Sequence, residues 1–206
     1  MNRHLTRLPR IPLLLLLVAL AALAVMWFLR PESAPQGNLS GSAVGGPFTL
    51  IDETGRTVTS DSFRGEWRLM YFGFTYCPDV CPVDAANIGA GLSAFEAENP
   101  RVAADVRPLF VTVDPERDTP AVLGEFTDNF HPRMLGLTGS REQIDAALQT
   151  FRIFSAKVPG VTEGSYTYDH LAIVYLMDPK GRPVEFLAGP TATAEAVQAM
   201  LERFVA

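Results

Sequence analysis

Two cysteines in one short segment have the spacing best suited to chemistry in this chain. Residues 74–82 read FTYCPDVCP, which places Cys77 and Cys81 four residues apart. If the first turn of a helix begins here, four residues rotate the side chains by about 400°, so both thiols lie on one helix face. The free N–H groups and the positive end of the helix dipole favour thiolate over thiol. Nucleophiles and soft-metal ligands both require the thiolate form.

Three interpretations of this thiol pair follow from the residues. The first is a structural role, as a disulfide or as two buried free thiols, but a disulfide here would close a loop with only three intervening residues, which constrains the unfolded chain little. A redox dithiol usually has the spacing Cys-x-x-Cys, and this chain has one residue more. The Pro-x-x-x-Thr-x-x-Cys pattern expected of a peroxiredoxin-type peroxidase is also missing, because Met70 stands where it requires Pro and Phe74 where it requires Thr. The third interpretation is a soft-metal site.

A histidine distinguishes the metal site from the other two interpretations. His170 precedes an apolar run predicted to be an antiparallel strand, and the start of such a strand lies at the sheet edge where parallel strands end. Asp169 is a candidate for orienting the His170 ring, although a turn or strand-capping role is equally open. His131, in Phe-His-Pro, stands at a predicted helix end, where a capping or solvent-exposed role is expected.

Two thiolates and one imidazole form a soft ligand set that suits copper. Thiolates favour Cu(I), and an added imidazole allows the site to hold Cu(II) as well. A structural zinc site would usually have a fourth protein ligand, and none is apparent. Thioredoxin-like reductases are expected to carry a proline just before the strand that follows His170, where this chain has Leu171. The residues therefore favour copper bound by Cys77, Cys81 and His170.

Strand and helix patterns alternate along the chain from residue 47. Apolar runs at 67–74, 106–113 and 134–137 predict buried parallel strands. Turn-rich segments predict β-hairpins within 48–58 and 171–187. Helical faces are predicted by Ile88, Leu92 and Phe95 after Pro82, by Leu123, Phe126 and Phe130 after Pro120, by Ile144, Leu148 and Phe151, and by Val197, Leu201 and Phe204 in a closing helix. We expect a three-layer α/β thioredoxin-like fold with an N-terminal β-hairpin.

Two connecting segments carry further expectations. Asp118 or Thr119, just before Pro120, is typical of a helix N-cap. The segment 155–168 has the length and turn composition of a mobile loop that lets His170 approach or leave the thiolates.

The N-terminal part predicts one transmembrane helix before the domain. Residues 11–29 contain no charged side chain, and Arg3, Arg7 and Arg10 precede them. This length can span a bilayer, and the arginines predict a cytoplasmic N-terminus. A cleaved signal peptide is the alternative, because Ala22-Leu23-Ala24 has the small-x-small form. The predicted organisation is a cytoplasmic tip and anchor at 1–30, a flexible linker at 31–46 and one domain at 47–206.

Composition excludes several classes of protein. The chain has 206 residues, 48% of them hydrophobic, and a net charge of -6, which falls to -10 when the four arginines of residues 1–30 are set apart. Such an acidic domain has no electrostatic footprint for nucleic acid. The low polarity argues against disorder, and two cysteines are too few for a disulfide-stapled miniprotein.

Four motifs in order closely resemble those of the Sco/SenC family of copper proteins. They are FGFTYCPDVCP at 72–82, VDPERDT at 113–119, GLTG at 136–139, and Asp169-His170. The resemblance covers about residues 47 to 205. It implies a membrane-tethered thioredoxin-fold protein that binds one copper through Cys77, Cys81 and His170. It also implies that the acids within 114–118 shape the site or contact partners. Family members often have His at the position of Tyr76, so an accessory ligand is missing here.

The main functional hypothesis is therefore a metallochaperone. It would deliver copper to the dinuclear copper centre of cytochrome c oxidase, or prepare that centre, with the copper-accepting oxidase subunit as its partner. The domain would lie on the periplasmic side of the inner membrane. The alternative is a thiol-disulfide reductase that uses Cys77 and Cys81 as a redox pair and depends on a thioredoxin-like reductant. The two can coexist, because a dithiol must be reduced to bind Cu(I).

Overall fold

The computed structural model describes residues 15, 16, 18–21 and 36–206. The chain divides into two units, Met1–Ala34 and Pro35–Ala206. The predicted anchor at 11–29 lies mostly outside the described residues, and the six described within it are helical. Within the described part, no helix has both the length and the apolar character needed to cross a membrane.

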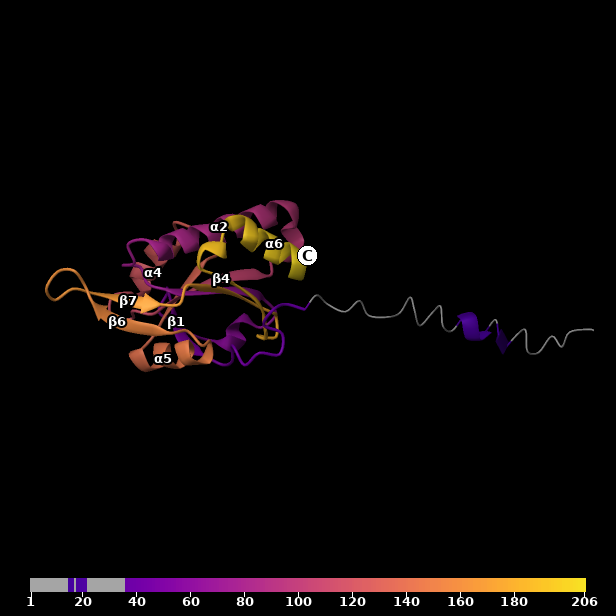
Figure 1. The fold of residues 1–206 in the computed structure, drawn as a ribbon, viewed down its shortest axis with the longest axis horizontal. Coiled ribbons are helices and arrows are strands. Elements are labelled where there is room, and N and C mark those ends of the chain that lie inside the picture. Colours follow the sequence, from indigo (N-terminus) through magenta and orange to yellow (C-terminus); the bar gives the residue numbers. More distant parts are fainter. Residues whose placement is uncertain (1–14, 17, 22–35) are drawn as a thin grey trace, which may run out of the picture. The chain divides into compact units, whose positions relative to one another are not determined.

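A seven-stranded sheet forms the middle layer of the second unit (Figure 1). Its order is β2-β1-β5-β4-β3-β8-β9. The central strands β3, β4 and β5 are parallel, whereas β1 and β8 run antiparallel to their neighbours in the sheet. The strands are β1 (Thr49–Asp52), β2 (Thr57–Thr59), β3 (Trp67–Gly73), β4 (Val106–Thr112), β5 (Leu135–Thr138), β8 (Ile173–Met177) and β9 (Pro183–Ala188). The predicted N-terminal hairpin and three parallel strands are confirmed.

Helices cover both faces of this sheet. Helices α2 (Val80–Glu98) and α6 (Ala194–Phe204) pack against each other on one face, and α5 (Arg141–Thr150) lies on the opposite face (Figure 1). Helix α4 (Pro120–Thr127) packs against β5, and α3 (Pro100–Ala103) is a single turn after α2. Two 3-10 turns, η1 (Ser60–Phe63) and η2 (Gly189–Thr191), complete the elements. The arrangement confirms the expected three-layer α/β architecture.

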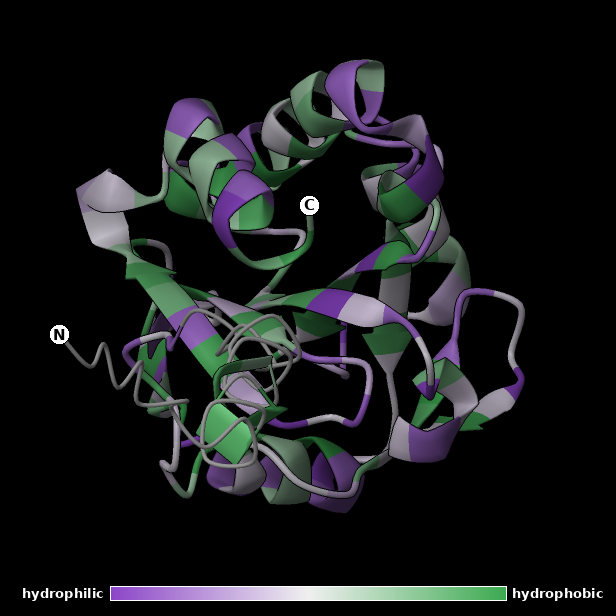
Figure 2. Cartoon of the chain, turned by 90° about the vertical axis from the view of Figure 1, so that its right-hand side faces the viewer, coloured by the Kyte–Doolittle hydropathy of each residue, from purple (hydrophilic) through white to green (hydrophobic). Residues whose placement is uncertain are grey.

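The core lies between these layers. Figure 2 shows apolar residues along the central strands. The last six residues of β3 are all buried, as expected for a central strand covered on both faces. The largest fully buried side chains include Tyr71, Phe72, Phe74, Phe95, Phe110 and Phe151. Burial of these rings contributes strongly to the hydrophobic stabilisation of the fold.

The structure differs from the sequence prediction in the segment that precedes His170. Instead of a loop, residues 155–170 form a β-hairpin of β6 (Ser155–Pro159) and β7 (Tyr166–His170), which pair only with each other. The alternation of apolar residues is too weak in these strands to predict them, so pairing and side-chain contacts determine the structure.

The predicted linker also differs from the structure over its described part. The N–H of Leu39 donates to the carbonyl of Val184 at 3.1 Å, and the N–H of Gly45 donates to that of Thr150 at 3.0 Å. Leu39 and Val44 pack against the core. Residues 36–46 therefore lie on the domain instead of forming a free tether, because two apolar side chains bind them to it.

Candidate metal centre

The thiol segment lies at the edge of the sheet where the parallel strands end. Strand β3 ends at Gly73, and α2 begins at Val80, so Cys81 lies in its first turn while Cys77 lies three residues before the helix. Strand β8 pairs antiparallel with β3, with Tyr71 opposite Val174. The start of β8, and with it His170 at the end of β7, is therefore at the same edge as the thiols.

Glycine at position 73 allows the sheet to approach the thiol closely. A Cβ atom at Gly73 would lie 3.0 Å from the Sγ of Cys81 and 2.7 Å from the Tyr71 ring. Both distances are too short for an ordinary contact, so a larger residue would displace Cys81 or Tyr71. The family motif around the cysteines thus has a steric reason for this glycine.

The three predicted ligands contact one another in a chain. The N–H of Cys81 donates to the Sγ of Cys77 at 3.4 Å, and the Sγ of Cys81 lies 3.4 Å from the Nε2 of His170. Both cysteines are free, with Cys81 buried and Cys77 half-buried. Across the described residues, no three His, Cys, Asp or Glu side chains are already gathered into a metal-binding cluster. Cys81 therefore contacts Cys77 and His170 separately, and a metal ion bound by all three would draw them closer together.

The two thiols have opposite ionisation preferences. Hydrogen bonds from the Cys81 side chain, from His170 and from the backbone outweigh burial and lower the pKa of Cys77 to about 3. Sharing its proton with Cys77, together with burial, raises the pKa of Cys81. Cys77 is therefore the thiolate and Cys81 the thiol at neutral pH. A metal that binds both must displace the remaining proton.

Aromatic rings pack around His170. Its ring lies edge-on to Phe74, with 5.8 Å between centroids, and edge-on to Tyr71 at 6.4 Å. Its Nδ1 lies 3.3 Å from the carbonyl oxygen of Leu171. If this nitrogen carries the proton, Nε2 is left free to bind a metal. The exposed carboxylate of Asp169 makes no hydrogen bond within the described part of the chain, so its orienting role stays a prediction.

Two polar groups beside the thiols were not identified from the sequence. Asp84 in α2 is 6% exposed, and burial raises the pKa of its carboxyl group. The hydroxyl of Tyr71 is buried without a hydrogen-bond partner among the described residues. The sequence did contain a signal for Asp84: it stands three residues after Cys81, and residues three apart on a helix lie on the same face.

His131 lies apart from the centre and is not exposed. It follows α4 and is 3% exposed, with its Nε2 3.4 Å from the Glu96 carboxylate. Its Nδ1 accepts a hydrogen bond from the N–H of Arg133 at 3.1 Å. The solvent-exposed role expected from the sequence is therefore wrong, because the chain after α4 turns the ring inward.

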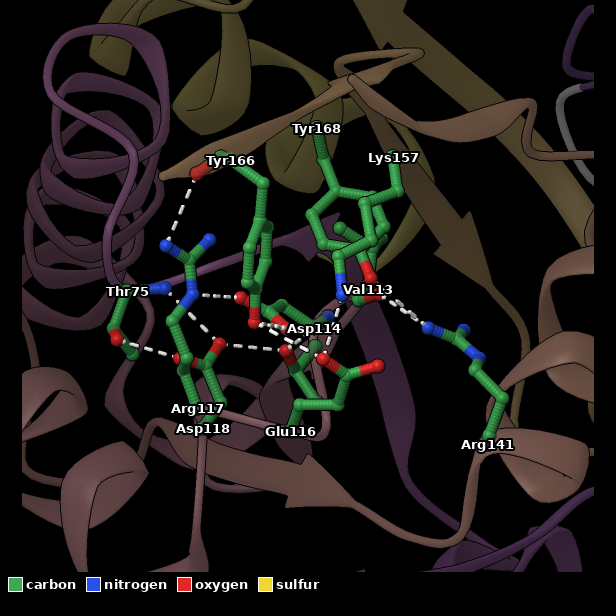
Figure 3. Close-up of polar contacts among 11 residues, drawn as sticks. Thr75, Val113, Asp114, Glu116, Arg117, Asp118, Arg141, Lys157, Tyr166 and Tyr168 are labelled. Carbon is green, nitrogen blue, oxygen red and sulfur yellow. Dashed lines mark hydrogen bonds and ion pairs between the residues drawn. The ribbon is translucent and has the colours of Figure 1, made fainter. Parts of the chain in front are cut away.

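The acidic segment 114–118 lies at the same sheet edge as the thiols, as expected from the position of β4. Thr119 is the N-cap of α4, and its hydroxyl accepts from the N–H of Val122. Asp118 has another role: its buried carboxylate accepts from the N–H and hydroxyl of Thr75 and from the hydroxyl of Thr112. Asp118 therefore holds the thiol segment against the end of β4 (Figure 3).

Comparisons with known proteins show which family the domain resembles. A family model described as SCO1/SenC matches residues 36–206. Protein SenC of Rhodobacter capsulatus is 45% identical over 172 residues, which cover 81% of this chain and 75% of SenC. The chain spans 42% to 65% of the length of the first mitochondrial SCO1 and SCO2 homologs that it matches.

Solved structures show the same fold. The structure of Bradyrhizobium japonicum ScoI with copper bound has a TM-score of 0.69 and 40% identity, covering 79% of this chain and 99% of ScoI. A structure that identifies a disulfide switch in BsSco, a member of the Sco family of cytochrome c oxidase assembly proteins, has a TM-score of 0.59 and 27% identity. It covers 84% of this chain and 96% of BsSco.

Proposed function

This chain belongs to the SCO1/SenC family, and on that premise we propose that it is a copper chaperone for cytochrome c oxidase. In this proposal, copper is a cargo that the protein delivers to, or uses to prepare, the dinuclear copper centre of the oxidase. The observation that carries it is the contact of Cys77 with Cys81 and of Cys81 with His170 at one sheet edge. ScoI, a relative with copper bound, supports it.

The donor set fits copper in both oxidation states. Two thiolates satisfy Cu(I), and the imidazole of His170 adds the ligand that favours Cu(II). In tetrahedral metal sites with bonds of about 2.3 Å to sulfur and about 2.0 Å to nitrogen, these ligand atoms stand about 3.5 Å apart. The observed separation between Cys81 Sγ and His170 Nε2 is 3.4 Å. A single ion between these two residues therefore needs little movement of either.

We further propose that a transmembrane helix at 11–29 tethers the domain to the inner membrane, with the N-terminus in the cytoplasm. The uncharged run and the preceding arginines support this topology. The domain then lies on the periplasmic side, where a copper-accepting oxidase subunit would be reached by diffusion in one membrane plane. Tethering raises the effective concentration of donor and acceptor without a tight interface.

Thiol-disulfide exchange is the second candidate, because the opposite ionisation of the two thiols suits it. The Cys77 thiolate would attack a disulfide of the substrate, form a mixed disulfide and release one substrate thiolate, which takes up a proton. Cys81, once deprotonated, would attack the Cys77 sulfur and release the second substrate thiol. The product is a Cys77–Cys81 disulfide, which a thioredoxin-like reductant must reduce. The disulfide switch in BsSco supports this alternative.

Copper titration of four proteins tests the proposal. The reduced wild-type chain is compared with Cys77→Ser, Cys81→Ser and His170→Ala for binding of Cu(I) and Cu(II). We expect either serine variant to lose both ions, and His170→Ala to lose Cu(II) while it keeps Cu(I). Unchanged Cu(II) binding in His170→Ala would contradict the three-ligand site. Oxidase assembly that survives His170→Ala but fails in Cys77→Ser would favour the exchange reaction.

A further inference from the structure

The hairpin that carries His170 has no backbone pairing with the main sheet. Strands β6 and β7 form a separate two-stranded sheet, whereas Cys81 lies in α2 and Cys77 lies in the segment between β3 and α2. Only two residues separate His170 from β8, which brings it to the sheet edge, and side-chain contacts then determine how the hairpin lies against the thiol segment. The contacts of one residue, Arg117, join the hairpin to the thiol segment.

Arg117 contacts both parts of the site. Its NH1 donates to the carbonyl of Tyr166 in β7 at 3.1 Å, and its guanidinium carbon lies 3.8 Å from the centroid of the Tyr166 ring. The same carbon lies 4.8 Å from the ring centroid of Tyr76, the residue before Cys77. Arg117 thus stacks on one aromatic ring four residues before His170 and on another next to the thiolate (Figure 3 shows the Tyr166 side).

The guanidinium is itself fixed to the body of the domain. Its Nε donates to the carboxylate of Asp114, which is fully buried at the end of β4. The hydroxyl of Tyr166 also donates to Asp114, at 3.2 Å. Arginine, carboxylate and phenol therefore form one closed set of contacts that aligns β7 with the strand ends.

Other cations that reach the hairpin make no contact with the thiol segment. Lys157 lies over the Tyr166 ring at 3.7 Å and pairs with Glu116, which is exposed. Arg141 donates to the Tyr168 hydroxyl at 3.4 Å. Among the cationic side chains of residues 36–206, only Arg117 contacts both the hairpin and the segment before Cys77.

We propose that Arg117 is a positioning residue that holds the His170 strand against the thiol segment, so that copper is bound by three ligands and not by the two thiolates alone. The inference rests on the proposed copper function and deepens it. It also gives Tyr76 a role, because the phenol ring provides a stacking surface for Arg117.

Arg117→Lys in the full chain is the test, because lysine keeps a cation beside Asp114 but loses the planar fork and the stacking. Losing about one hydrogen bond and one cation–π contact predicts about tenfold weaker Cu(II) binding. Cu(I) binding should change less than about twofold, because both thiolates stay in place. Amide hydrogen exchange of residues 166–170 in the metal-free protein should become faster.

Two further variants complete the experiment. Arg107→Lys makes the same substitution in an arginine paired with Glu66 near the start of β4, away from the site, and should alter none of these quantities. Tyr76→Leu removes only the exposed ring beside Cys77 and should shift Cu(II) binding in the same direction as Arg117→Lys, by less.

Several results would overturn the inference. They are equal losses of Cu(I) and Cu(II) binding in Arg117→Lys, unchanged Cu(II) binding, or the same effect in Arg107→Lys. Failure of the proposed function would be visible separately, as wild-type protein that binds no Cu(II) through thiolate. In that case amide hydrogen exchange in the metal-free protein is the remaining test of the positioning role. Unchanged exchange of residues 166–170 in Arg117→Lys rejects that role.

Discussion

At the scale of single residues, Cys77 and Cys81 show how position differentiates two identical side chains. Cys77 is half-buried and accepts hydrogen bonds, whereas Cys81 is fully buried and shares its proton with its neighbour. The accessible sulfur is therefore both the more ionised and the more reactive one. In the proposed copper function, this asymmetry suits a metal that arrives from solvent. In the alternative exchange reaction, it suits attack by the Cys77 thiolate on a substrate disulfide.

The low pKa of Cys77 predicts its reactivity with iodoacetamide. With a pKa of about 3, its thiolate population and its alkylation rate should be nearly constant from about pH 5 to about pH 8. Cys81→Ala removes the largest cause of the lowered pKa and should restore a rate that rises with pH. Mass spectrometry of the labelled peptide measures the rate. In the wild type, a rate that rises about tenfold per pH unit would contradict the assignment.

Asp118 provides the second prediction at this scale. Asp118→Ala leaves three donors, from Thr75 and Thr112, without their acceptor in a buried site. We expect a loss of about 3 kcal/mol in the free energy of unfolding. Chemical denaturation of the variant and of Asp61→Ala, an exposed control, measures it. A loss no larger than that of the control would show that Asp118 does not hold the thiol segment.

The site residues differ in how far the sequence could predict them. Cys77, Cys81 and His170 follow from topology, because parallel strand ends and an antiparallel strand start meet at one edge. Arg117 could not be predicted, since its contacts with Tyr76 and Tyr166 join segments far apart in the chain. The exposed role expected for His131 failed because a local pattern does not show which way a ring turns.

At the scale of elements, helix α2 positions Cys81 and is itself held by close backbone contacts. A Cβ atom at Gly91 would lie 2.5 Å from the carbonyl oxygen of Ala194 and 2.7 Å from the Val197 side chain. Only glycine lets α6 approach α2 this closely. At Gly124 in α4, by contrast, the nearest atoms lie at the ordinary contact distances of 3.6 to 3.8 Å, on Glu53.

The two glycines therefore predict opposite effects of one substitution. Gly91→Ala should destabilise the domain by about 2 kcal/mol, because α6 must shift away from α2. Gly124→Ala should stabilise it by up to about 1 kcal/mol through higher helix propensity. Thermal unfolding of both variants measures the difference. Equal effects of the same sign would contradict the packing described between α2 and α6.

The elements also show where sequence patterns fail. The central strands and the helices were predicted because burial leaves a continuous apolar run in such strands and a repeated apolar face on the helices. The β6–β7 hairpin was not, because its strands lie on the surface and are stabilised by contacts of Tyr166 and Tyr168. The described part of the linker was misjudged for a similar reason: Leu39 and Val44 are too few to form a pattern, yet both pack on the core.

At the scale of the whole molecule, the proposed function requires an acidic domain and a membrane anchor in one chain. The proposed anchor predicts that the full chain stays in the membrane fraction after extraction at alkaline pH. Replacing Leu16 and Leu20 with Arg should release it, because each charge opposes insertion by about 3 kcal/mol. Immunoblotting of the fractions measures this, with Val161→Arg, at a fully exposed position, as the control. A mature N-terminus near Val25 would instead indicate a cleaved signal peptide.

The central claim is that one copper ion binds Cys77, Cys81 and His170 together. X-ray absorption at the copper edge of the reduced, Cu(I)-loaded full chain tests the thiolates, and the Cu(II)-loaded form tests the full set most directly. The account predicts two sulfur ligands and a nitrogen from imidazole around Cu(II), with the nitrogen lost in His170→Ala. A copper ion without sulfur ligands, or an identical nitrogen contribution in His170→Ala, would contradict it.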